Sequence, residues 1–136
     1  MKRLFLAIGI LLVAGCTPEP SFHGRPFSQW RQDLKSKEVS DRWRAVDVMF
    51  EFGPVAKHAI PELIDCLHDK EFRVRIIAAQ VLGNLGPEAK EAMPDLVQLL
   101  KDEDPKVRSA AAEALDHIDP QATIRKPPSV PGGVRK

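Results

Sequence analysis

A 17-residue stretch of this chain occurs twice. GPVAKHAIPELIDCLHD begins at Gly53, and GPEAKEAMPDLVQLLKD begins at Gly86, 33 residues later. Nine of the 17 aligned positions are identical, whereas unrelated sequences of ordinary composition share about one. The offset also spaces other positions equally, among them Arg42, Arg75 and Arg108, Ala45, Ala78 and Ala111, and Leu34, Leu67 and Leu100. A repeat of this length is typically one supersecondary unit that stacks on its neighbours, so we expect repeats at about 26–53, 54–86 and 87–119.

The apolar residues within each repeat follow a helical spacing. Val74, Ala78, Val81, Leu82 and Leu85 recur at three- and four-residue intervals, and the equivalent positions of the next repeat copy them. Asp104 followed by Pro105 predicts a helix start, and Gly86 followed by Pro87 predicts a helix end. Pro61 and Pro94 favour a short turn before the first helix of a repeat. The predicted fold is all-α, a short α-solenoid of about three antiparallel helical hairpins.

These residues resemble the HEAT repeats, in particular the short bacterial kind with the pattern GPxAxxAxPxLxxLLxDxDxxVRxxAAxAL. The match is closest over residues 87–115, good over 53–85 and weaker over 26–49. The resemblance implies a ladder in which aspartates between the helices pair with arginines of the second helices, namely Asp69, Arg75, Asp102 and Arg108. The first repeat departs from the pattern with Ser36 at the aspartate position, so its rung of the ladder stays open.

The N-terminus reads as a targeting segment. Lys2 and Arg3 precede an apolar, charge-free run from Leu4 to Ala14. Those 11 residues would span about 16 Å as a helix, too short for a hydrocarbon layer of about 30 Å. We therefore expect a cleaved signal over residues 1–15 rather than a membrane span.

The end of that signal, LVAGC, resembles the bacterial lipobox, in which small residues precede a cysteine that is acylated and becomes the new N-terminus. The resemblance implies lipidation of Cys16 and attachment to a membrane through lipid, on the extracytoplasmic side of the cell envelope. The alternative is a conventional signal peptide with a chance cysteine. We expect a flexible tether over 16–25, a repeat domain over 26–119 and a disordered tail, rich in proline and glycine, over 120–136.

Composition and motifs argue against several classes of function. With 20 basic and 19 acidic residues, the chain has no bulk charge that would attract nucleic acid. The four histidines show no metal-ligand spacing, and there is no glycine-rich phosphate loop or nucleophile elbow. Cys66 lies in a core column with Leu99, which favours burial over catalysis. We expect no enzyme, no catalytic or metal-binding residue, no cofactor and no small-molecule substrate.

One surface of the second helices is a candidate protein-binding site. Trp43, Ile76 and Ile77 lie off the core stripe, and the resemblance to HEAT repeats implies that these helices line the concave face. Polar neighbours of this candidate patch include Arg73 and Gln80. The alternative is that the three apolar side chains pack against neighbouring repeats. The arginine column has two readings as well, structural pairing between repeats or binding of a phosphate or an acidic peptide.

Two functions remain for such a chain. The first is a non-catalytic protein–protein interaction module, a scaffold or adaptor that is lipid-anchored in the bacterial cell envelope and binds an unknown protein partner. The second is a structural accessory subunit of an envelope enzyme or transporter complex. Stoichiometric co-purification in detergent would favour the second.

Lipidation gives the first testable prediction. Because the thiol of Cys16 is the atom that would carry the lipid, Cys16→Ser should release the protein from the membrane or leave its signal unprocessed. Mass spectrometry of the mature N-terminus measures the modification directly. An unmodified chain that starts at any residue other than Cys16 would contradict the prediction.

Overall fold

The computed structural model describes residues 18–121. The predicted signal, Cys16 and the predicted tail beyond Gln121 lie outside the described residues. Two short strands come first, followed by six α-helices and two 3-10 helices: β1 (Ser21–Phe22), β2 (Arg25–Pro26), α1 (Phe27–Asp33), α2 (Val39–Phe52), η1 (Gly53–Ala59), α3 (Ile60–Cys66), α4 (Phe72–Leu85), η2 (Gly86–Ala92), α5 (Met93–Leu99) and α6 (Pro105–Ile118).

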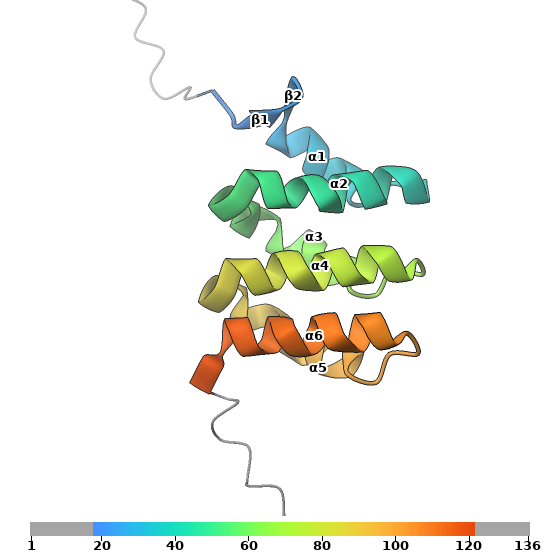
Figure 1. Cartoon of the computed structure of the whole chain (residues 1–136). Coiled ribbons are helices and arrows are strands. Elements are labelled where there is room, and N and C mark those ends of the chain that lie inside the picture. The colour runs from blue at the N-terminus through green and yellow to red at the C-terminus, as the bar shows by residue number, and fades with distance from the viewer. Residues whose placement is uncertain (1–17, 122–136) are drawn as a thin grey trace, which may run out of the picture.

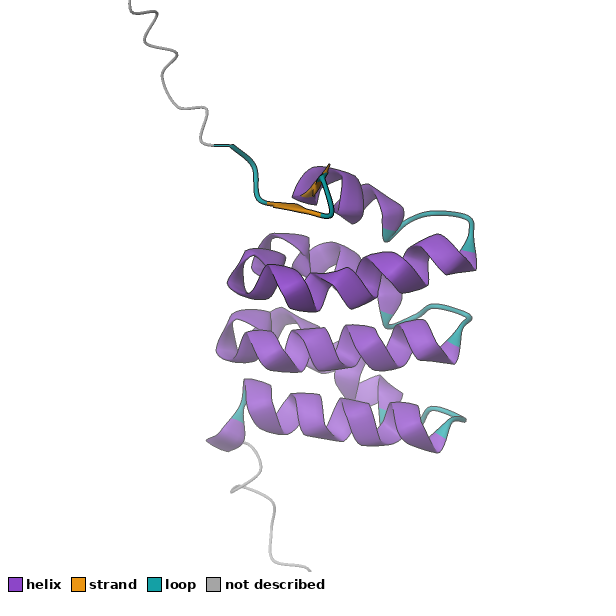
Figure 2. Ribbon diagram, turned by 45° about the horizontal axis from the view of Figure 1, so that its top comes forward, coloured by secondary structure: helices purple, strands orange, loops and turns teal. Residues whose placement is uncertain are grey.

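The helices form a stack of hairpins. The long helices α2, α4 and α6 lie side by side, and the shorter helices α3 and α5 lie behind them (Figures 1 and 2). The repeat columns form the core, since Ala45, Ala78 and Ala111 are all fully buried. The predicted all-α solenoid of antiparallel hairpins is confirmed.

Prolines divide the first half of the second and third repeats into two segments, as predicted. Pro61 and Pro94 lie in the first turn of α3 and α5, where a missing amide hydrogen is tolerated. The seven residues before each of these helices form the 3-10 helices η1 and η2. The second and third repeats therefore each consist of a 3-10 helix, a short helix and a long helix, whereas the first consists of α1 and α2. The 3-10 helix connects the long helix of one repeat to the short helix of the next.

Glycine ends two of the long helices in a backbone conformation that other residues rarely adopt. Gly53 has φ 50° and ψ −125°, and Gly86 has φ 59° and ψ −137°. Positive φ agrees with the predicted helix end, although both ψ values lie outside the left-handed helical region. α6 starts as predicted, because the Asp104 carboxylate accepts hydrogen bonds from the amides of Lys106 and Val107.

The segment before α1 differs from the flexible tether expected over 16–25. In its described part, β1 and β2 form a two-residue hairpin with positive φ at His23 and Gly24. The Phe22 carbonyl accepts a hydrogen bond from Trp30 Nε1 at 3.3 Å, and the Phe22 ring packs edge-on against Phe52 with 6.4 Å between centroids. These contacts attach the segment to the first helical hairpin and cap that end of the stack (Figure 1).

No helix within residues 18–121 combines the length and the apolar composition that crossing a bilayer requires.

Leu82 provides a test of the core. Its side chain is fully buried in the predicted helical stripe, so Leu82→Ala should lower the free energy of unfolding by about 2–5 kcal/mol. Denaturant titration measures the change. Val97→Ala is the matched control, since Val97 is 51% exposed and should lose less than about 0.5 kcal/mol. Equal losses in the two variants would contradict the assignment of the stripe.

Candidate functional site

Ion pairs join neighbouring hairpins along one edge of the stack. Arg42 Nε lies 2.5 Å from Asp69 Oδ2, and its Nη2 donates to Oδ1 at 2.9 Å. One repeat further, Arg75 Nε lies 2.9 Å from Asp102 Oδ2, and Nη2 donates to Oδ1 at 3.0 Å. The Arg42 pair is bidentate, the geometry in which arginine binds a carboxylate most strongly. In the Arg75 pair Nη2 makes the hydrogen bond, and Nε lies close to the carboxylate without hydrogen-bond geometry.

The ladder runs across repeats in one direction, from an arginine to the aspartate of the next hairpin. Asp69 and Asp102 also accept hydrogen bonds from the backbone amides of Glu71 and Asp104, both at 2.9 Å. The first repeat takes part despite Ser36, because Arg42 uses the carboxylate of the second repeat rather than one of its own. Sequence reasoning left this rung open because it looked for the aspartate within the first repeat.

The aspartates of the ladder stay ionised at neutral pH. For both, burial acts to raise the pKa, but hydrogen bonds to the charged form outweigh it. Arg42 and the Glu71 amide lower the pKa of Asp69, and the Asp104 amide and Arg75 lower the pKa of Asp102. The Arg42 pKa is raised in turn, chiefly by its hydrogen bond to Asp69. These groups therefore serve as fixed ion pairs, the structural reading of the arginine column.

The three apolar residues of the predicted binding patch differ in how far they are buried. Trp43 is 43% exposed, whereas Ile76 and Ile77 are half-buried and pack against the core. Arg73 and Gln80 are exposed on α4, and the Arg73 guanidinium lies 5.7 Å from the centre of the Phe72 ring. For the two isoleucines the structure therefore favours packing, and of the three apolar residues of the predicted patch only Trp43 is exposed.

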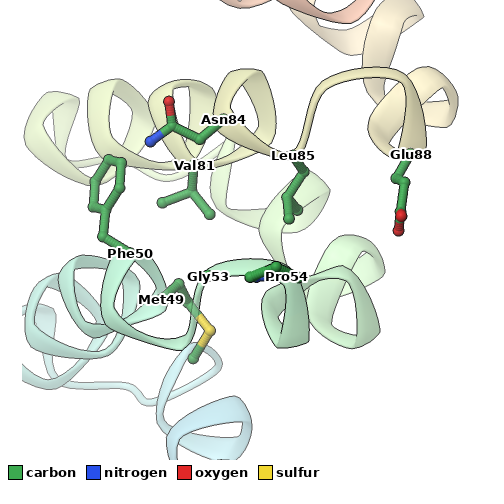
Figure 3. A pocket seen from close by; sticks show the side chains of 8 residues that line it. All are labelled: Met49, Phe50, Gly53, Pro54, Val81, Asn84, Leu85 and Glu88. Carbon is green, nitrogen blue, oxygen red and sulfur yellow. The ribbon is translucent and has the colours of Figure 1, made fainter.

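The same three helices also form two shallow pockets that the sequence reasoning did not find. The first, of about 250 Å³, lies between α2 and α4, and the second, of about 300 Å³, lies between α4 and α6. Phe50 and Asn84 line both pockets. In Figure 3 the Phe50 ring rises from α2 toward α4, and Val81 and Leu85 point down from α4 into the first pocket.

A glycine shapes the second pocket. Gly83 packs so closely on α6 that a Cβ there would lie 2.9 Å from the Ala114 Cα. The position one repeat earlier is Phe50, so one column changes from a large ring to no side chain. Both residues line the second pocket, and at Gly83 the missing side chain lets α6 approach closely. Comparing side-chain size along the 50/83 column would have indicated this difference from the sequence.

Two buried groups that could carry chemistry are held in unreactive states. Burial raises the pKa of the Cys66 thiol to about 12, so it remains protonated at neutral pH. Glu62 is buried on α3, and burial acts to raise its pKa, but the hydrogen bond from Arg31 at 2.7 Å keeps it lowered. Within residues 18–121 no group of three or more histidine, cysteine, aspartate or glutamate side chains could hold a metal ion.

The ladder predicts a pH dependence of stability. Because folding lowers the pKa of Asp69 and Asp102, their contribution is complete above the unfolded value of about 4 and is lost as pH falls through the folded values. Asp69→Asn with Asp102→Asn should cost about 1–3 kcal/mol at pH 7 and flatten the acid limb of the stability curve. The exposed Glu103→Gln is the control. Parallel curves for the double variant and the wild type would contradict this role of the ladder.

The comparisons with known proteins agree with this geometry. A search of curated protein sequences gave no match. The family model for HEAT repeats matches residues 60–126, a region that contains α3 to α6 and both aspartates of the ladder. The chain folds as a short all-α solenoid of the HEAT-like kind, and its residues 60–126 are similar to HEAT repeats.

Proposed function

We propose that this protein is a non-catalytic adaptor that is lipid-anchored through Cys16 in the bacterial cell envelope and binds a protein partner on the face of α2, α4 and α6. HEAT repeats generally mediate protein–protein interaction. The lipobox-like LVAGC at the end of a short apolar segment supports the anchor. The protein would bind its partner through non-covalent contacts and would not catalyse a reaction on it.

One observation carries the choice of face, the exposure of Trp43 on α2, the helix whose Phe50 lines both pockets. Tryptophan is enriched among residues that dominate binding energy, and an exposed tryptophan on a folded domain is unusual without a partner. Phe50, in the same helix, is half-buried and lines both hollows. The face therefore combines an aromatic anchor with concavities of the size of one or two partner side chains.

The polar residues around these hollows favour hydrogen bonding as well as apolar contact. Gln80, Asn84 and Glu113 are exposed along the second pocket. The amides of Gln80 and Asn84 can donate and accept hydrogen bonds, so they suit a partner backbone or amide side chains. Such groups around an aromatic residue supply the polar rim that protein interfaces usually have.

A crosslinking experiment in the native envelope tests the proposal. A photoreactive residue at Gln80 should give a discrete crosslinked product, and Trp43→Ala should abolish it while Tm stays within a few degrees of wild type, since the Trp43 side chain contributes little to the core. Ile76→Ser tests the half-buried part of the patch, and it should lower Tm more than Trp43→Ala.

The matched control is Val97→Ser, which removes an exposed apolar side chain from α5 rather than from the proposed face. It should leave the crosslink unchanged. A crosslink that survives Trp43→Ala, or a large fall of Tm in that variant, would overturn the proposal.

A further inference from the structure

The three arginines of the ladder column, Arg42, Arg75 and Arg108, make the same hydrogen bonds within their own repeats. In each case Nη1 donates to two carbonyls of the loop that precedes the long helix. The distances are 3.0 and 3.0 Å for Arg42, 2.8 and 3.2 Å for Arg75, and 2.8 and 3.1 Å for Arg108. The loop thus orients each guanidinium before any carboxylate binds, which reduces the entropy that binding would cost.

Arg108 differs from Arg42 and Arg75 in what lies near its Nε and Nη2. Arg42 and Arg75 use Nε and Nη2 for the aspartate of the next hairpin. Among residues 18–121 no carboxylate lies within ion-pair distance of Arg108, and the residue is exposed. The column of Asp69 and Asp102 continues to position 135, which is Arg135. Arg108 therefore presents a bidentate site that the sequence does not fill in register.

At the same end of the stack, that of α5 and α6, residues of the apolar columns are exposed although their counterparts in earlier repeats are buried. Leu34 and Leu67 are 3% and 0% exposed, but Leu100 in the same column is 40% exposed. Val46 and Ala79 are fully buried, whereas their counterpart Ala112 is exposed. We call the surface of Val97, Leu100, Arg108 and Ala112 the open end. Its Leu100, Arg108 and Ala112 occupy the columns of Leu34 and Leu67, Arg42 and Arg75, and Val46 and Ala79, whose side chains are buried or ion-paired in the two earlier repeats.

The sequence of residues 119–136 does not continue the repeat pattern. Positions 132 and 133, which continue the buried columns of Leu99 and Leu67, are both glycine, and Ser129 continues the column of Leu63 and Leu96. These residues lack the side chains that cover a neighbouring hairpin. Residues 119–136 therefore do not continue the apolar pattern that covers the earlier hairpins.

A second copy of this chain is poorly suited to bind the open end. Its N-terminal end has Ser36 where the ladder needs a carboxylate, and the β1–β2 hairpin lies against the first helical hairpin there. Two open ends placed together would bring Arg108 close to its own copy, with Lys101 and Lys106 exposed nearby. Like charges at an interface cost free energy.

We propose that the open end is a docking site for a different protein, one that presents the edge of a helical hairpin with an aspartate or glutamate directed at Arg108. Charge complementarity and the two internal precedents define this partner, whose carboxylate would take the place that Asp69 and Asp102 take within the stack. The site extends the proposed adaptor function with a second surface, at the opposite end of the stack from the β1–β2 cap (Figure 1).

A duplication of one repeat tests whether the open end accepts such a hairpin. Residues 86–118 are copied and inserted directly after Ile118 in the full chain, so that a second copy of Asp102 comes into register with Arg108. The extended protein should unfold in one transition, with Tm raised by about 5 °C or more. Arg108→Gln should lower Tm more in the extended protein than in the original one. Changing the copied aspartate to asparagine should remove that difference.

Two transitions, an unchanged Tm, or an equal effect of Arg108→Gln in both proteins would overturn the proposal. The original full-length protein gives an independent measurement if the extended chain fails to fold. A photoreactive residue at Leu100, in the native envelope, should crosslink to a different protein. That product should disappear with Arg108→Glu and persist with Trp43→Ala.

The second measurement separates this site from the face of α2, α4 and α6. Loss of the Leu100 crosslink in Trp43→Ala, its survival in Arg108→Glu, its absence from the wild type, or a product of twice the chain's mass would each contradict a separate docking site for another protein at the open end. Loss of the Gln80 crosslink alone would leave the open end intact.

Discussion

A single helical hairpin of this protein cannot bury its apolar surface alone. The structure therefore depends on the stacking of each hairpin against its neighbour. The alanine column lets neighbouring long helices approach closely, and Gly83 brings α4 nearer still to α6. Apolar contact between helices is non-directional, so it leaves their register weakly specified. The ion pairs of Arg42 with Asp69 and Arg75 with Asp102 supply direction, because each fixes a helix of one repeat against the loop of the next.

The repeat period made most of the fold predictable, because every constraint on one hairpin appears again 33 residues later. Features that occur once were not predictable in this way. The β1–β2 hairpin has no counterpart in later repeats, and its turn uses His23 and Gly24 at positive φ rather than the commoner Asn-Gly. The Arg42 pair was missed for a related reason, since its carboxylate belongs to the second repeat.

The candidate site was harder to predict than the core because exposure depends on differences between repeats. Trp43 and Ile76 share a column, yet one is exposed and the other half-buried. The isoleucine packs against the core, whereas the indole does not. The second pocket also lies where the repeats differ, because Phe50 and Gly83, which occupy one column, both line it. The repeat pattern describes the positions that the repeats have in common, whereas the candidate binding site lies at positions where they differ.

The two ends of the stack are unequal, and this follows from the direction of the ladder. Each arginine points toward the C-terminal neighbour, so the first hairpin needs no acidic partner before it and can be closed by aromatic contacts among Phe22, Phe27 and Phe52. The last hairpin necessarily ends with an oriented guanidinium and the apolar columns around it. A ladder that runs one way therefore generates a closed end, where aromatic residues pack, and an open end, where Arg108 is oriented by its own loop but has no carboxylate of a next hairpin within the described residues.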